Sequence, residues 1–133
     1  MATKSGILGL IIGVATVLII VSAVGENTDS QVSEIGIVEE SGFSQSCAET
    51  DCYTPSVLTI KSGTVVTMTN TDETGVHTFT SGTVEGFTPN PDGVFDTGVL
   101  MSGDSFEWTP ISSGEYPYYC MLHTWQVGTI IVN

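Results

Sequence analysis

From residue 57 to the C-terminus, the sequence is a succession of short runs rich in Val, Thr, Ile and aromatic residues, separated by turn-forming residues. These residue types favour the pleated surface of a β-strand, and good helix formers are scarce beyond residue 26. Short strands at this spacing predict an antiparallel β-sandwich or barrel. The expected strands cover residues 57–60, 64–69, 76–81, 105–109, 115–120 and 128–133, and residues 86–93, rich in Pro, Asn and Gly, are expected to form a loop.

The N-terminal segment predicts export from the cytoplasm. Lys4 is followed by an uncharged and mainly apolar run that ends at Gly25. The run approaches the roughly 20 residues of a membrane-spanning helix, which favours an anchor with Lys4 inside and the rest of the chain outside. A signal peptide cleaved after residue 23 is the alternative, and it would leave a secreted domain.

This pattern divides the chain into three expected parts. Residues 1–25 are expected to form the signal peptide or membrane anchor, and residues 47–133 the β domain. Residues 26–46 are polar and acidic and are expected to form a linker, within which residues 32–40 could contribute a first strand.

The charge of the chain limits its partners. Fifteen acidic residues stand against two lysines and no arginine, which gives a net charge of −13. Nucleic acids and anionic lipid surfaces are disfavoured as partners, because both are bound through clustered lysine and arginine. The negative charge favours solubility or attracts a basic partner protein.

The three cysteines are an odd number, so at most two of them can pair within the chain. Cys47 and Cys52 lie in one short segment, and in an exported chain they are expected to form a disulfide. Cys120 would then remain free. A disulfide between Cys120 and one of the other two is the alternative.

Cys120 lies three residues before His123, in a chain with only two histidines. A lone buried cysteine is usually a small apolar residue, and a lone histidine is usually a hydrogen-bonded structural group. A thiolate and an imidazole on one short loop can, however, bind one metal ion, and a sandwich can bring His77 to them from another strand. Two imidazoles and one thiolate form the trigonal ligand set of a blue-copper electron-transfer site, although zinc also accepts these ligands.

The segments that carry these residues are "NTDETGVHTFTSG" (70–82) and "GEYPYYCMLHTWQVGTIIV" (114–132). They resemble the upstream histidine segment and the C-terminal copper loop of the cupredoxins of the plastocyanin and amicyanin type. Residues 93–120 also resemble the part of that family that leads into the cysteine. The resemblance covers residues 56–133 and implies a Greek-key β-sandwich, a cupredoxin domain with one type 1 copper.

The resemblance also implies roles for single residues. His77, Cys120 and His123 match the family's equatorial copper ligands. Thr78 falls where a backbone N–H donates to the cysteine sulfur, and Asn70 is a further candidate for supporting the ligands from just outside the ligand set.

Position 126 departs from the family pattern. The amicyanin-like loop runs Cys-x-x-His-Pro-aromatic-Met, whereas Thr124 and Gln126 occupy the proline and methionine positions here. A long axial bond to Gln126, as in the stellacyanin-like cupredoxins, would favour Cu(II) and lower the reduction potential, because an amide oxygen is a harder ligand than a thioether. In the alternative, Gln126 points away and the axial position is empty or holds water.

The resemblance implies a one-electron carrier that cycles between Cu(II) and Cu(I) and exchanges electrons with redox partner proteins. Tyr119, beside Cys120, and Trp125, near His123, are candidates for the electron route, and both would also suit a packing role. The alternative function is a small copper enzyme or sensor that binds nitric oxide or a similar molecule at an open axial position. A carrier rather than a catalyst is expected, because no general base or second metal site accompanies the motif.

Overall fold

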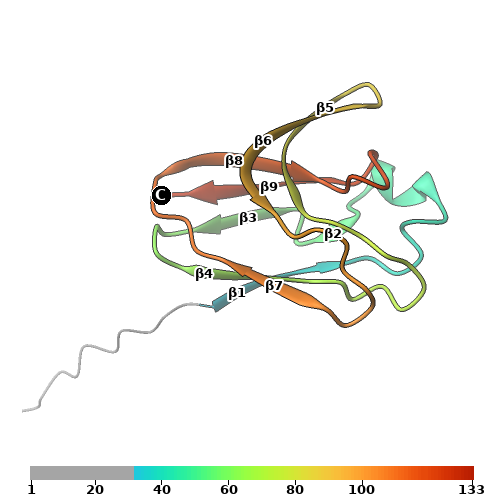
Figure 1. Ribbon diagram of the computed structural model, residues 1–133, viewed down its shortest axis with the longest axis horizontal. Helices are drawn as coiled ribbons and strands as arrows, with labels where there is room; N and C mark the ends of the chain where they lie inside the picture. Colours follow the sequence, from blue (N-terminus) through green and yellow to red (C-terminus); the bar gives the residue numbers. More distant parts are fainter. Residues whose placement is uncertain (1–31) are drawn as a thin grey trace, which may run out of the picture.

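The computed structural model describes residues 32–133, and within this range two β-sheets pack face to face (Figure 1). The elements are β1 (Val32–Ile37), the 3-10 helix η1 (Gln45–Glu49), β2 (Tyr53–Thr54), β3 (Val57–Ile60), β4 (Val65–Thr69), β5 (Thr80–Glu85), β6 (Thr88–Asp96), β7 (Ser105–Trp108), β8 (Gly114–Tyr119) and β9 (Val127–Val132). One sheet has the order β2-β1-β4-β7, and the other has the order β3-β9-β8-β5-β6. The expected all-β sandwich is confirmed.

Strand pairing is mixed, whereas a purely antiparallel arrangement was expected. β1 runs parallel to β4, with Ile35 opposite Met68, and β3 runs parallel to β9, with Ile60 opposite Val132. The other strand pairs are antiparallel. Parallel neighbours require long connections, and here these connections carry the chain from one sheet to the other.

An aromatic group in the core supports the segments that carry the candidate ligands. The ring centroid of Tyr53 lies 4.9 Å from that of Phe79 and 4.8 Å from that of Tyr118, and all three side chains are buried. Phe79 follows His77 by two residues, and Tyr118 precedes Cys120 by two. Side chains two residues apart on an extended chain lie on the same face. The packing of Phe79 and Tyr118 in the core therefore holds the backbone near the candidate ligands His77 and Cys120.

The expected linker at residues 26–46 requires a correction. From Val32 onward this segment belongs to the sandwich: it contains β1, which lies between β2 and β4, and η1 begins at Gln45. The alternating residues Ile35 and Ile37 are buried, and their burial outweighs the acidic composition that suggested a linker. The first strand considered possible at residues 32–40 is confirmed as β1, and the β domain therefore begins before residue 47.

The prediction of a loop at residues 86–93 is also wrong, because most of this segment belongs to β6. Pro89 and Pro91 suggested a loop, but β6 is the outer strand of its sheet, where a missing amide hydrogen is tolerated. Figure 1 shows the β5–β6 hairpin extending beyond the sandwich. At Gly82, which has a φ of +133°, a Cβ atom would collide with the carbonyl oxygen of Asn90, so the two strands approach closely only because residue 82 is glycine.

Cys47 and Cys52 form the expected disulfide, which ties η1 to the residue before β2. Cys120 is free and buried. The signal peptide or anchor expected at residues 1–25 lies outside the described residues, as do residues 26–31 of the expected linker. Within residues 32–133, no helix has the length and apolar character needed to cross a membrane.

Candidate metal centre

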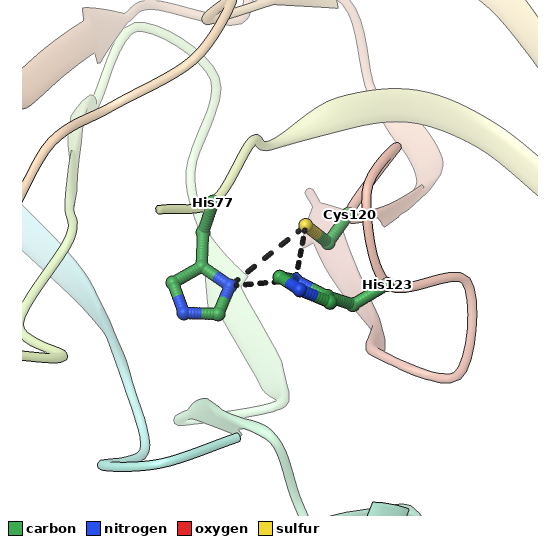
Figure 2. A group of neighbouring side chains, drawn as sticks. All are labelled: His77, Cys120 and His123. Carbon is green, nitrogen blue, oxygen red and sulfur yellow. Dashed lines mark hydrogen bonds between the residues drawn. The ribbon is translucent and has the colours of Figure 1, made fainter. Parts of the chain in front are cut away.

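Three side chains from two distant segments point toward one another (Figure 2). His77 lies between β4 and β5, and its backbone exchanges two hydrogen bonds with Leu100, of 3.2 and 2.8 Å. Cys120 follows the last residue of β8, and His123 lies in the turn between β8 and β9. The fold thus brings these three residues, from two separate parts of the sequence, into one cluster.

The donor atoms of the cluster have the spacing of a metal site. Sγ of Cys120 lies 3.8 Å from Nδ1 of His77 and 3.5 Å from Nδ1 of His123, and the two Nδ1 atoms are 3.2 Å apart. A trigonal metal with bonds of about 2.0–2.1 Å to nitrogen and about 2.3 Å to sulfur would hold its donors roughly 3.5–3.8 Å apart. The two sulfur–nitrogen distances lie in this range and the 3.2 Å between the nitrogens is slightly shorter, so the cluster suits one mononuclear ion. A thiolate with two imidazoles favours copper.

The turn after β8 brings His123 back over Cys120. The amide of His123 donates to the Cys120 carbonyl (3.2 Å), the amide of Gln126 donates to the His123 carbonyl (2.9 Å), and the amide of Cys120 donates to the Gln126 carbonyl (3.1 Å). These three bonds between backbone atoms close a compact loop. The proline of the amicyanin-like pattern is therefore not needed to form the turn, which has Thr124 in its place.

Further contacts surround the sulfur of Cys120. The Thr78 amide donates to Sγ at 3.4 Å, which is the contact that the resemblance implied. The Thr78 hydroxyl accepts a hydrogen bond of 2.8 Å from the Met121 amide, so Thr78 joins both ligand segments. An amide that donates to a thiolate stabilises its negative charge.

The surroundings of the cluster shift the pKa values of its three side chains. Burial would raise the pKa of Cys120, but the hydrogen bonds from His77 and from the Thr78 amide outweigh it, so the pKa is lowered. Burial would lower the pKa of His77, but Cys120 and Asp72 raise it. Burial and the neighbouring His77 lower the pKa of His123. A lower pKa makes the thiolate, which is the form of cysteine that binds a metal, more accessible.

Gln126 is fully buried, and its two amide atoms have different surroundings. Nε2 donates to the Ser41 hydroxyl at 2.8 Å, whereas Oε1 has no hydrogen-bond partner within the part of the chain that the structure describes. The indole of Trp125 donates to the Ser41 carbonyl at 3.0 Å. A buried carbonyl oxygen without a donor is costly unless another group, such as a metal, satisfies it.

Asn70 connects the turn before His77 to the rest of the domain. Its Nδ2 donates to the carbonyl oxygens of Gly75 and Leu100, both at 2.9 Å, and its Oδ1 accepts from the Asp72 amide at 3.0 Å. Asp72 in turn has its Oδ2 atom 2.8 Å from Nε2 of His77. Sequence reasoning missed Asp72; its only signal is an acid in a turn five residues before the histidine.

The two candidates for the electron route have different surroundings. Tyr119 is fully buried next to Cys120, and its hydroxyl has no hydrogen-bond partner among residues 32–133. The ring of Trp125 lies 5.2 Å from that of His123, with an interplanar angle of 54°. Trp125 therefore packs directly beside the most exposed member of the cluster.

The two methionines of this region are both partly exposed. Met121 is 40% exposed and Met101 is 58% exposed, so both side chains lie at the surface.

No family model and no curated protein matches the sequence. Solved structures do match. A purple cupredoxin from Nitrosopumilus maritimus is 33% identical with a TM-score of 0.64, and the match covers 76% of this chain and 99% of that one. A copper-containing nitrite reductase (NirK) from Thermus scotoductus is 28% identical with a TM-score of 0.57, over 77% of this chain but 22% of the enzyme. An oxidized single-site mutant of amicyanin shares the fold at 18% identity and a TM-score of 0.54, over 77% of this chain and 82% of amicyanin.

Proposed function

The chain belongs to the cupredoxin family, and from this premise we propose that it carries single electrons through one type 1 copper held by His77, Cys120 and His123. The observation that supports this most directly is the convergence of one sulfur and two Nδ1 atoms at distances of 3.2–3.8 Å. Bound copper would supply the redox chemistry, since Cu(II) accepts one electron to become Cu(I) and Cu(I) releases it again.

The residues of the chain keep the site nearly unchanged between the two oxidation states. His77 is fixed by its backbone pairing with Leu100, and Cys120 and His123 by the backbone bonds of their turn. Because these ligands need little movement when the charge changes, electron exchange requires little rearrangement.

His123 is the proposed point of electron entry and exit. Cys120 and His77 are fully buried, whereas His123 is partly exposed beside Trp125. Tyr119 is the proposed second route from the sulfur into the domain. A redox protein with a basic docking surface suits the net charge of −13.

Gln126 is the proposed axial ligand. Its Oε1 atom is buried and lacks a donor among the described residues, while Nε2 is held by Ser41. An amide oxygen binds Cu(II) better than a thioether does, so we expect a lower reduction potential than that of a methionine-ligated site.

Absorption and EPR spectra of the copper-loaded chain test this function. We expect an intense thiolate-to-Cu(II) band in the visible range, which is lost in Cys120→Ser. Absence of the band in the wild-type protein with one bound Cu(II) would contradict the proposal.

A second function, binding or turnover of nitric oxide or a similar small molecule, has two observations in its favour. The chain is 28% identical to part of a copper-containing nitrite reductase. A cleft of about 380 Å³, lined partly by Gly42, Phe43 and Met101, borders His123. Addition of nitric oxide to the copper-loaded chain distinguishes the two functions, because new ligand bands or turnover support the second and an unchanged spectrum supports the carrier.

We also propose that residues 1–25 export the chain and hold it at the outer face of the membrane. Cell fractionation, together with the mass of the mature N-terminus, distinguishes an anchored chain from one that is cleaved and secreted.

A further inference from the structure

His77 presents its two ring nitrogens to different partners. Nδ1 faces Cys120 and His123, and Figure 2 shows the other nitrogen pointing away from both. That second nitrogen, Nε2, lies 2.8 Å from Oδ2 of Asp72, and both side chains are fully buried. The pair forms a buried contact directly behind the metal-facing side of the ring.

The Asp72 carboxylate is held independently of His77. Its Oδ1 atom accepts hydrogen bonds from the Thr74 amide (2.9 Å), the Thr74 hydroxyl (2.7 Å) and the Glu40 amide (3.2 Å). Within the described chain, Oδ2 has His77 as its only hydrogen-bond partner. Three donors on one oxygen fix the carboxylate, so that the other oxygen stays directed at the imidazole.

Gly75 leaves the space for this contact. A Cβ atom at position 75 would lie 2.9 Å from Oδ2 of Asp72 and 2.9 Å from Nε2 of His77. Any side chain there would push between the two groups. The turn from Asn70 to His77 is therefore built so that the carboxylate reaches the ring.

From this geometry we infer that Asp72 is a positioning residue that tunes the copper site through His77. The carboxylate accepts a hydrogen bond from Nε2–H, which leaves the Nδ1 lone pair free for the metal and fixes the plane of the ring. Its negative charge also makes the imidazole a stronger donor, and a stronger donor favours Cu(II) over Cu(I). This inference rests on the proposed function and adds a determinant of the potential outside the ligand set.

Asp72→Asn in the copper-loaded full chain tests the inference, with Glu73→Gln as the matched control. Both changes remove one negative charge from the same turn, but Glu73 is exposed, whereas Asp72 is buried against His77. We expect Asp72→Asn to lower the preference for Cu(II) over Cu(I) about tenfold, which raises the reduction potential by about 59 mV. Glu73→Gln should shift it by much less, because solvent and salt screen the exposed charge.

Two further measurements separate positioning from a purely structural role. Nitrogen NMR of the diamagnetic Cu(I) form should show the proton of His77 on Nε2, exchanging more rapidly in Asp72→Asn than in the wild type. Gly75→Ala should raise the potential without removing any charge, because it separates the carboxylate from the ring.

The outcomes are distinct. If Asp72→Asn moves the potential no further than Glu73→Gln while the wild type shows its thiolate band, this inference is overturned and the carrier function stands. If the wild type shows no such band, the carrier function fails first, and the inference fails with it.

Discussion

Gln126 donates a hydrogen bond of 2.8 Å from Nε2 to the hydroxyl of Ser41, 85 residues earlier in the sequence. Ser41 belongs to the segment between β1 and η1, and its carbonyl also accepts the indole hydrogen of Trp125 at 3.0 Å. The two contacts hold the end of the ligand turn against this segment. They also leave Oε1 as the atom of Gln126 without a partner among residues 32–133.

Gln126→Met should raise the reduction potential. A thioether stabilises Cu(I) relative to an amide oxygen, and each tenfold change in relative affinity corresponds to about 59 mV. We expect a rise of at least this size, measured by redox titration of the visible band. An unchanged potential would show that Gln126 is not a ligand.

Ser41→Ala should loosen the Gln126 amide without touching a proposed equatorial ligand. The change removes the acceptor of a buried N–H group, which costs about 1–3 kcal/mol. We expect lower stability in urea unfolding and a broader EPR spectrum, since the amide can then rotate. Ser44→Ala is the control, because the Ser44 hydroxyl bonds only within its own exposed turn. An EPR spectrum that broadens equally in the two variants would contradict the role of Ser41.

The cluster of His77, Cys120 and His123 could be predicted from the sequence because both of its segments resemble the family pattern. Cys120 and His123 share one turn, and His77 is the only other histidine. The Ser41–Gln126 contact could not be predicted, because it depends on β1 pairing with β4, and the sequence does not show which strand a first strand at residues 32–40 would join.

The role of Asp72 could not be predicted from the sequence either. Asp72 and Glu73 are neighbouring acids in one turn, and the sequence does not say which of them faces inward. The choice depends on hydrogen bonds from Thr74 and from Glu40, the latter contributed by a distant segment. In the same way, β6 was missed because the effect of proline depends on whether a strand lies at the edge of its sheet.

Tyr53→Phe and Tyr118→Phe should differ in stability although both remove one buried hydroxyl. The Tyr53 hydroxyl donates to the Thr78 carbonyl at 2.8 Å, so its loss should cost about 0.5–1.5 kcal/mol. The Tyr118 hydroxyl has no partner among the described residues, so its removal should be neutral or stabilising. Urea unfolding of both variants measures the difference, and equal losses would contradict the assignment.

Removal of the disulfide should destabilise the fold but leave the copper spectrum unchanged. The bridge joins residues only five positions apart, so the Cys47→Ser/Cys52→Ser variant should lose about 2 kcal/mol, the low end for a disulfide. Cys120 is the proposed thiolate ligand and takes no part in the bridge. A changed visible band in this variant would mean that the segment from residue 47 to 52 shapes the site.

The stability of the chain should fall at alkaline pH in a way that depends on Tyr53. Burial, followed by the charges of Cys120 and Tyr118, raises the pKa of Tyr53 well above its ordinary value of 10.0. Below pH 10 the phenol is protonated in both the folded and the unfolded chain, so its contribution to stability is fully present. Above pH 10 the unfolded chain releases the proton and the folded chain keeps it, so stability falls by up to about 1.4 kcal/mol per pH unit from this group.

Urea unfolding of wild type and Tyr53→Phe between pH 8 and 11 measures this contribution. The difference in unfolding free energy should be constant below pH 10, where the lost hydrogen bond to Thr78 makes the variant less stable. Above pH 10 the difference should shrink, because the variant has no proton to release at position 53. Since all other groups are shared, they cancel in the comparison. Curves that stay parallel over the whole range would show that the phenol titrates alike in both states.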